Sequence, residues 1–395
     1  MIAFLSFLFW FSVAAILYTY VVYPVLLLLL SSFHQAIKDT RFVLSKQGRR
    51  KRETELPEVT IVIAAYNEEK CIKERVENLL SLTYPADKLK ILIGSDGSSD
   101  NTNSLLSAFS DPRLEAVLFE ENRGKINVLN DLLSRVDTPV TVFSDANTFF
   151  QPDAINKLVA DFRDDNIGGV CGELELVDAV SGDNKDSLYW QYEQILKFHE
   201  SRINAMLGAN GAIYAIRTAL YEPLPANTIV DDFCVFMGVA RQGYKVVYNP
   251  EARAIEEIAP NLKEEAGRRV RIGAGNYQTM SRLTWMLNPF IGSRCFSYVS
   301  HKVIRWFVPH FMLLALITNA VLAFGSQVYS VLMCFHALFY LAYFYGLNMS
   351  STKQGKLAAI IRLITFFVTM NVSLGQGFIR FLTTKQSATW KRTAR

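Results

Sequence analysis

Several residues that can bind an anion or carry negative charge lie where a loop leads into a predicted helix. Lys125 follows Gly124 where a polar loop leads into a predicted helix. A lysine and the free backbone N–H groups of a helix start together favour phosphate binding. A lysine on a solvated surface is the alternative interpretation. The junction therefore predicts either an anion-binding lysine or an ordinary surface cation.

Carboxylates gather at two further loop-to-helix junctions. Residues 96–100 read Asp-Gly-Ser-Ser-Asp, and residues 230–232 read Val-Asp-Asp. Asp and Ser are common in turns and at helix N-caps, and the helix dipole stabilises carboxylates in a first helical turn. Both junctions can thus be local structure alone. They can also serve ligand chemistry if the fold brings them together.

The elements that must position these residues form a regular alternation from residue 59 onward. Four β-branched runs, VTIVIAA, KILIGS, LEAVLF and PVTVFS, are each followed by an amphipathic stretch, over residues 69–82, 100–109, 125–136 and 154–162. This alternation predicts an α/β domain with a mostly parallel sheet and helices on both faces. Such sheets bind ligands at the carboxyl ends of their strands.

The polar motifs follow those four strands. In chain order they are Tyr66-Asn67-Glu68, Asp96-Gly97-Ser98, Asn122-Arg123-Gly124-Lys125 and Ser144-Asp145-Ala146-Asn147. We therefore expect one site at one edge of the sheet. After a predicted helix from Asp186 to Met206, a glycine-rich loop at residues 208–212 permits close backbone approach to a ligand. Another helix is predicted to begin near Asp231.

The histidines and cysteines argue against zinc chemistry. None of the five cysteines forms a CxxC pair, which fits reduced cytosolic thiols. The five histidines lack metal-ligand spacing and any partnered nucleophile, so we interpret them as structural or interfacial. The residues are Cys71, Cys171, Cys234, Cys295, Cys334, His34, His199, His301, His310 and His336.

The charge is segregated along the chain. Hydrophobic residues make up 50% of it and charged residues 20%, yet residues 2–33 and 306–352 contain no Asp, Glu, Lys or Arg. A membrane-spanning helix needs about 20 apolar residues. The first stretch predicts one span and the second, broken at Gly325, a hairpin of two. The uncharged start and the length of the first stretch argue against a cleaved signal peptide.

Basic residues flank these apolar stretches. The cluster at residues 49–52 predicts a cytosolic position for it and for residues 57–300, with the N-terminus outside. The net charge of +4 and the position of the basic clusters favour membrane lipids over nucleic acid as a partner. An uncharged run at residues 363–379, with small polar residues, predicts a third C-terminal span.

These patterns predict the following organisation. Residues 1–33 form an N-terminal transmembrane helix, 34–56 a basic linker, 57–282 the cytosolic α/β domain, 283–306 interfacial helices, 307–382 two or three transmembrane helices, and 383–395 a basic tail.

The motifs, taken in order, resemble the family 2 glycosyltransferases with the GT-A fold. The segments IVIAAYNEE, SDGSSD, NRGKINVLN, SDAN and VDD carry the resemblance, which extends over about residues 57–280. Together with the flanking apolar helices, the chain is similar to the synthases of cellulose, hyaluronan, chitin and poly-N-acetylglucosamine. The resemblance implies a Rossmann-like domain that binds a nucleotide sugar, most often a UDP-sugar.

The resemblance also implies roles for individual residues. Tyr66 would stack on the base, Asp96 would accept a hydrogen bond from its ring N–H, and Lys125 would contact the diphosphate. The full set of expected nucleotide-sugar contacts is Tyr66, Asn67, Glu68, Asp96, Gly97, Ser98, Lys125, Asp145 and Arg271.

Asp145 and Asn147 occupy the place of the family's DxD motif, which binds a divalent ion. Carboxylate, amide and phosphate oxygens suit Mg²⁺ or Mn²⁺. The chain departs from many relatives because Asn147 offers a neutral carbonyl. We expect Asn147→Asp to preserve or tighten metal binding.

The acceptor side is expected from residues later in the chain. Asp232 stands where relatives carry the general base, and Asp231 would position acceptor or base. The QxxRW signature of processive synthases reads Arg-Arg-Val-Arg-Ile here, and only its arginine, Arg271, matches. Gly211, Arg268 and Arg269 are further acceptor-side candidates, although both arginines also suit a basic helix surface.

The expected function is inverting, metal-dependent transfer of a sugar to a growing polysaccharide or a lipid-linked acceptor. The expected location is the plasma membrane of a bacterium. Two alternatives remain open. One is the addition of a single sugar to a lipid-linked acceptor, which the altered RRVRI segment favours. The other is a noncatalytic membrane scaffold that binds a nucleotide sugar.

Overall fold

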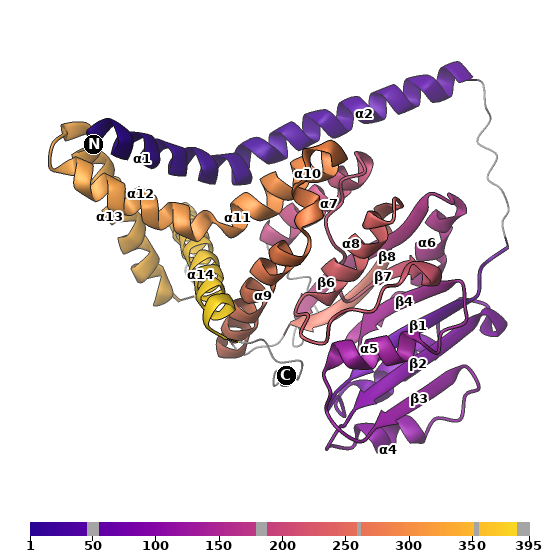
Figure 1. Ribbon diagram of the computed structural model, residues 1–395. Helices are drawn as coiled ribbons and strands as arrows, with labels where there is room; N and C mark the ends of the chain where they lie inside the picture. The colour runs from indigo at the N-terminus through magenta and orange to yellow at the C-terminus, as the bar shows by residue number, and fades with distance from the viewer. Residues whose placement is uncertain (46–54, 179–187, 259–261, 351–354, 385–395) are drawn as a thin grey trace. The chain divides into compact units, whose positions relative to one another are not determined.

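The computed structural model describes residues 1–45, 55–178, 188–258, 262–350 and 355–384 (Figure 1). Within these residues the chain forms two compact units. One contains residues 27–262 and 290–297, and the other contains residues 1–26, 263–289 and 298–384. The basic cluster at residues 49–52 and most of the predicted basic tail lie outside the described residues.

The first unit, which we call the sheet unit, is built on an eight-stranded sheet with the order β3-β2-β1-β4-β7-β6-β8-β5. β1 to β4 run parallel to one another. The strands are β1 (Val59–Ala65), β2 (Leu89–Asp96), β3 (Leu114–Phe119), β4 (Val140–Asp145), β5 (Thr148–Phe150), β6 (Ile167–Asp178), β7 (Tyr214–Arg217) and β8 (Lys245–Ile258).

The helices of this unit connect and cover the strands (Figure 1). They are α3 (Ile72–Leu80), α4 (Thr102–Ser107), α5 (Lys125–Leu133), α6 (Ala154–Ala160), α7 (Leu188–Arg202) and α8 (Asp231–Arg241). The unit also contains α10 (Ser293–Ser297) and the greater part of α2 (Tyr23–Ser45), which connect no strands. All seven residues of β1 are buried, as expected of a central strand whose two faces are covered by helices. Leu79 of α3 packs in the same core as Ile61 and Ile63 of β1.

The sheet is mostly parallel as predicted, since β6 and β8 also pair in parallel, but the pairings made by β7 and β5 are antiparallel. β7 pairs antiparallel with both β4 and β6, and β5 pairs antiparallel with β8. β7 and β5 have only four and three residues, which is too short for a periodic pattern to identify a strand. The parallel half, which carries the four polar loops, has the predicted order of elements.

The predicted helix from Asp186 to Met206 is shorter in the structure. Its described part, α7, begins at Leu188 and ends at Arg202, and Asp186 lies outside the described residues. Past α7 the chain turns at Asn204, which has a positive φ of 55°. The predicted start of α8 near Asp231 is confirmed.

The second unit, which we call the helical unit, contains α1 (Ile2–Leu17), a π-helical turn at Tyr18–Val22, and the first residues of α2 (Tyr23–Ser45). It also contains α9 (Leu262–Arg282), α11 (Ile304–Trp306), α12 (Val308–Ala323), α13 (Gln327–Leu347) and α14 (Lys356–Thr383). α2 continues to Ser45, so the first part of the predicted linker is helical.

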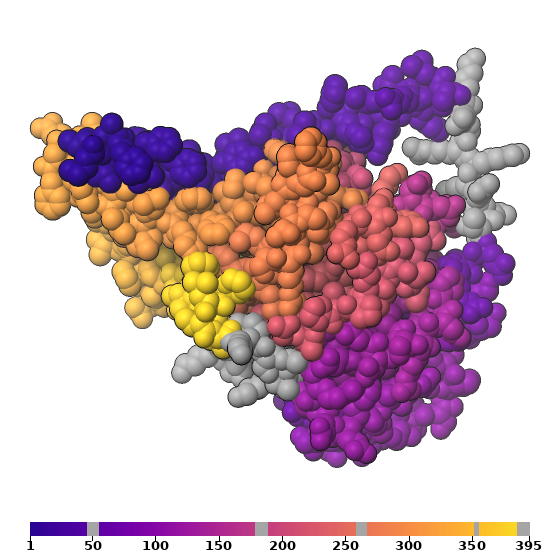
Figure 2. Space-filling view, viewed as in Figure 1, coloured from indigo at the N-terminus to yellow at the C-terminus, as the bar shows by residue number. Residues whose placement is uncertain are grey.

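Three helices among the described residues are long and apolar enough to cross a membrane. They are Ile2–Ser45, Gln327–Leu347 and Lys356–Thr383, and the bent pair Ser293–Trp306 and Val308–Ala323 forms a fourth candidate if it is counted as one span. Phe4 and Phe7 of α1 are more than 60% exposed, and the indigo atoms of this helix lie at the surface in Figure 2. These apolar surfaces fit contact with lipid.

Helix α9 lies directly against α14 in the helical unit. A Cβ atom on Gly377 would come within 2.7 Å of the backbone nitrogen of Ala274, and one on Gly273 within 3.3 Å of the Gly377 Cα. Such close backbone approach is the usual reason for small residues at contacts between membrane helices. The predicted packing role of the small residues near position 375 therefore fits Gly377.

Candidate active site

The loops after β1 and β2 are joined by hydrogen bonds between their residues. Asn67, with a positive φ of 55°, accepts a hydrogen bond from the Ser99 backbone N–H at its Oδ1 (2.8 Å). The Asn67 backbone N–H donates to Ser98 Oγ (3.0 Å), and that of Glu68 donates to Thr102 Oγ1 (2.8 Å). Asn67 and Ser98 thus fix the shape of this part of the site.

Asp96 joins the second loop to the third. Its side chain is fully buried, and its two carboxylate oxygens accept hydrogen bonds from the backbone N–H groups of Arg123 (2.8 Å) and Gly124 (2.9 Å). Gly97 has a positive φ of 63°, and a Cβ there would come within 2.5 Å of the Asn122 nitrogen. Asp96 and Gly97 therefore set the position of the loop that carries Lys125.

Lys125 lies between two carboxylates at the sheet edge. Its Nζ is 2.9 Å from Asp145 Oδ1 and 3.1 Å from Asp231 Oδ2. Burial lowers the pKa of Lys125, but the charges of Asp145 and Asp231 and the hydrogen bonds to them outweigh burial and hold the pKa above its usual range. The ammonium group of Lys125 therefore lies between a carboxylate at the end of β4 and a carboxylate at the start of α8.

Asp232 lies in the first turn of α8, beside Asp231. Burial and the neighbouring charge of Asp231 raise the pKa of Asp232 to about 6, against a hydrogen bond from the Phe233 backbone N–H and the charges of two lysines. A Cβ on Gly211 would lie 3.7 Å from Oδ2 of both Asp145 and Asp232. Gly211 therefore leaves open a space between the metal-motif carboxylate and the candidate base.

The side-chain amide of Asn147 is hydrogen-bonded to a residue of β8. Its Nδ2 donates to Glu256 Oε1 of β8 (2.9 Å). Sequence reasoning missed Glu256, which lies more than a hundred positions further along the chain. The segment AIEEIAP around it carries no motif that could have singled it out.

Two other charged side chains near the site were also missed. Arg75 of α3 is fully buried, donates to Ser144 Oγ (2.8 Å) and stacks over the Phe150 ring (4.4 Å). Burial lowers the pKa of Arg75, whereas the charge of Asp145 opposes this shift. Lys197 of α7 donates to Asn210 Oδ1 in the glycine-rich loop. Neither residue belongs to a recognisable motif, and only the fold brings them here.

The chemistry of the donor set fits a divalent metal ion. Asp145 and Asn147 provide a carboxylate and an amide, the oxygen ligands that Mg²⁺ and Mn²⁺ prefer, and the Lys125 ammonium already contacts Asp145 as a cation. Among the described residues, no group of three His, Cys, Asp or Glu side chains is placed to hold a metal. The phosphates of a bound nucleotide would have to complete the coordination.

The remaining predicted residues divide between the two units. Tyr66 and Glu68 are half-buried in the loop after β1. Arg268, Arg269 and Arg271 belong to α9 of the helical unit, where Arg269 packs over the Phe366 ring of α14 (5.7 Å). The roles of these arginines toward donor or acceptor stay predictions.

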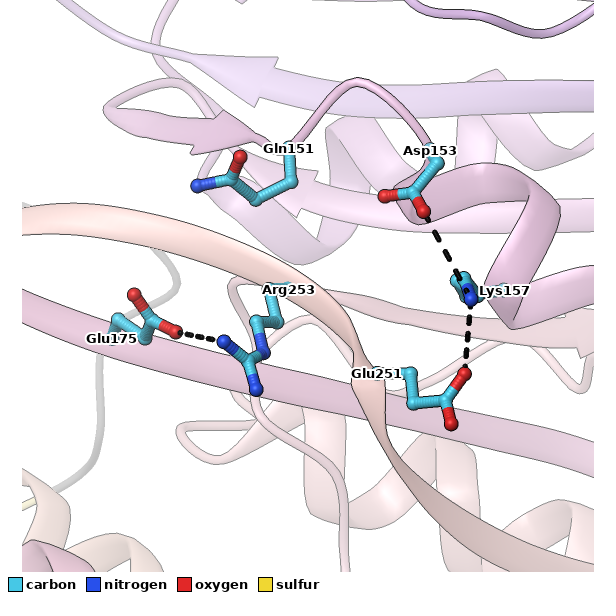
Figure 3. Close-up of a pocket in the computed structure, with 6 residues that line it drawn as sticks. All are labelled: Gln151, Asp153, Lys157, Glu175, Glu251 and Arg253. Carbon is cyan, nitrogen blue, oxygen red and sulfur yellow. Dashed lines mark hydrogen bonds and ion pairs between the residues drawn. The ribbon is translucent and has the colours of Figure 1, made fainter.

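A separate polar hollow of about 510 Å³ lies elsewhere in the sheet unit (Figure 3). Its charged side chains are paired with one another. Lys157 contacts Glu251 (3.0 Å) and Arg253 contacts Glu175 (3.3 Å). None of the predicted site residues lines it, so we assign it no part in the chemistry at the strand ends.

Comparisons with known proteins agree with the geometry. Residues 60–222 match the family model described as Glycosyl transferase family 2. The poly-beta-1,6-N-acetyl-D-glucosamine synthase of Staphylococcus aureus (strain COL) is 27% identical over 241 residues, covering 58% of this chain and 57% of the relative. The synthase of the same name from Staphylococcus epidermidis is 25% identical over 240 residues. The matched part spans little more than half the length of these relatives.

A solved structure supports the fold over nearly the whole chain. The mannosyltransferase PcManGT from Pyrobaculum calidifontis, in complex with GDP-Man and Mn²⁺, superposes with a TM-score of 0.68 at 20% identity, covering 95% of this chain and 99% of that one. The chain therefore contains a segment, residues 60–222, that matches the family 2 glycosyltransferase domain, has the GT-A fold, and carries helices long and apolar enough to span a membrane.

Proposed function

We propose that this chain is an inverting, metal-dependent enzyme that transfers a sugar from a nucleotide sugar of the UDP-sugar class to a saccharide or lipid-linked acceptor at a membrane. The strongest support is that Asp145 and Asp232 both face Gly211 and that Lys125 contacts Asp145. A displacement at a sugar carbon needs metal ligands, a cation for phosphate and a base for the acceptor. Asp145 at the end of β4, Lys125 at the start of α5 and Asp232 in the first turn of α8 are the candidates for these three roles.

Asp232 acts as the general base. Its pKa, raised by burial and by Asp231, is high enough for a useful base and low enough for the carboxylate to be ionised at neutral pH. The acceptor hydroxyl gives its proton to Asp232 as its oxygen bonds to C1 of the sugar. The bond from C1 to the phosphate oxygen breaks in the same step, and the nucleoside diphosphate leaves.

Lys125 stabilises the charge of the departing diphosphate. In the structure its ammonium contacts Asp145 and Asp231, so binding of the donor phosphates would draw it away from Asp145. This exchange frees Asp145 as a metal ligand together with Asn147. A divalent ion, Mg²⁺ or Mn²⁺, would supply Lewis-acid stabilisation of the leaving group there.

The proposal is tested by nucleoside diphosphate release from the purified protein in membrane lipids. UDP-sugars and GDP-mannose are offered as donors, with and without a chelator. We expect release that a chelator abolishes and that Mg²⁺ or Mn²⁺ restores, and we expect Asp145→Ala to be inactive. Full activity in chelator would exclude a metal role for the Asp145 loop.

We infer polymer synthesis as the overall activity, in line with the names of the curated relatives. Addition of one sugar to a lipid-linked acceptor is the second candidate, because Ile272 stands where processive synthases carry tryptophan. Sizing the product distinguishes them. A ladder of long chains supports the synthase, and a single added sugar on a lipid supports the alternative.

A further inference from the structure

An asparagine is an unusual metal ligand because only one end of its amide can bind a cation. The amide oxygen is a ligand, whereas the NH₂ group is a donor that a cation repels. A free Asn147 side chain could present either end, since the two are nearly equal in size. Something must therefore fix its orientation if Asn147 is to replace a carboxylate.

Glu256 is in position to fix it. β8 runs antiparallel to β5 with Glu256 opposite Thr148, which brings the glutamate beside the preceding residue, Asn147. Asn147 Nδ2 and Glu256 Oε1 are 2.9 Å apart. An ionised carboxylate only accepts hydrogen bonds, so the amide must turn its NH₂ toward Glu256 and its oxygen the other way.

From this geometry we propose that Glu256 is a positioning residue that orients the Asn147 amide, so that Oδ1 faces the metal ion. The inference rests on the proposed metal-dependent function. Hydrogen bonds behind metal ligands commonly contribute about 10- to 100-fold to metal affinity. With this hydrogen bond, the asparagine presents its amide oxygen in one direction. An aspartate needs no such partner, because both of its terminal atoms are oxygens.

Two other roles for Glu256 predict different behaviour. If it only adds negative charge, any neutral replacement weakens binding equally. If it is itself a metal ligand, Glu256→Ala weakens binding by the same factor whether residue 147 is asparagine or aspartate. Orientation alone requires an acceptor, which the glutamine carbonyl retains and alanine lacks. The comparison of Glu256→Gln with Glu256→Ala therefore separates orientation from charge, and the same comparison in an Asn147→Asp background separates orientation from direct ligation.

The test measures Mn²⁺ affinity by the loss of the free-ion electron paramagnetic resonance signal, with UDP as the added nucleotide. We expect Glu256→Gln to bind within about 3-fold of the original protein and Glu256→Ala to bind about 10-fold or more weakly. Glu257→Ala is the matched control, because this exposed neighbour on β8 carries the same charge. It should leave the affinity unchanged.

The same measurement in an Asn147→Asp background completes a double-mutant cycle between positions 147 and 256. An aspartate needs no orienting partner, so Glu256→Ala should change affinity there by less than about 3-fold, well below the usual contribution of a positioning group. Equal losses for Glu256→Gln and Glu256→Ala, or equal losses in both backgrounds, would overturn the proposal. Thermal unfolding of each variant identifies any that fails to fold, and Glu256→Gln remains informative if Glu256→Ala does not fold.

Failure of the inference is distinguishable from failure of the proposed function. If the original protein binds no Mn²⁺ in the presence of UDP or GDP, the metal-dependent function and the role of Glu256 both fall. If the original protein binds Mn²⁺ and Asp145→Ala does not, while Glu256→Ala binds normally, only the positioning role is wrong.

Discussion

At the scale of single residues, the site combines charged groups that shift one another's pKa values. Lys125 is held by Asp145 and Asp231, and Asp232 is pushed toward its protonated form by burial and by Asp231. Such opposed pairs are common where a protein uses a carboxylate as a base. The arrangement has a direct consequence for pH dependence.

We expect kcat/KM to fall as the pH drops below about 6. The pKa of Asp232 is raised to about 6, and only the ionised carboxylate accepts a proton, so activity is present above this pKa and lost below it. Because kcat/KM reports the free enzyme, initial rates at low substrate concentration between pH 4.5 and 8 measure it. A flat profile across pH 5 to 7 would contradict the assignment of the base.

Gly211 gives a second residue-scale prediction. A methyl group at this position would lie 3.7 Å from a carboxylate oxygen of both Asp145 and Asp232, which is ordinary contact and should not disturb folding. The methyl would nevertheless fill the space between metal motif and base. We expect Gly211→Ala to keep its thermal stability and to lose turnover by about 10-fold or more, since small misplacements of reacting groups are costly. Unchanged turnover would show that the acceptor does not enter there.

At the scale of elements, the parallel half of the sheet was predictable and the remainder was not. The apolar runs of β1 and β3 have the predicted bounds, Val59–Ala65 and Leu114–Phe119. β1 is buried throughout, as a continuous β-branched segment predicts, whereas β3 is an edge strand without a fully buried residue. β5 and β7 were missed because their few residues are strands only through pairing with β8 and β4.

The candidate site was predictable to the same extent. Lys125, Asp145 and Asp232 stand in motifs and converge as expected. Arg75, Lys197 and Glu256 support them from elements distant in sequence, and no local pattern marks a residue whose partner is chosen by tertiary packing. The predicted contacts of Asn67 and Ser98 with a nucleotide remain predictions, since the structure gives both residues hydrogen bonds that shape the loops.

The crossing of α9 and α14 gives an element-scale prediction. A Cβ on Gly377 would lie 2.7 Å from backbone atoms of α9, so Gly377→Ala should force the two helices apart and lower the free energy of unfolding by about 1–3 kcal/mol. Thermal unfolding in detergent measures the loss. Gly267→Ala on α9 is the control, because no atom lies within 4 Å of a Cβ there and alanine favours the helix. Equal stability of the two variants would contradict this contact.

At the scale of the whole molecule, the apolar helices and the basic cluster at residues 49–52 define an expected topology. We predict that a single cysteine at Lys51 reacts with a membrane-impermeant reagent only after the cells are opened. A cysteine at Ser326, between α12 and α13, should react in intact cells. Both variants are made in a chain without its five native cysteines. Labelling of position 51 in intact cells would reverse the orientation.

The measurement that tests the account most directly is donor affinity and turnover in Asp232→Asn. The pKa of Asp232 is raised, so the folded state favours the protonated form and the ionised form costs stability above pH 6. The neutral amide should therefore fold at least as well at pH 7. It cannot accept the proton of the acceptor, so we predict normal affinity for the nucleotide sugar and turnover lower by about 100-fold or more. Near-normal turnover in a folded Asp232→Asn protein would remove Asp232 from the chemistry and contradict the proposed mechanism.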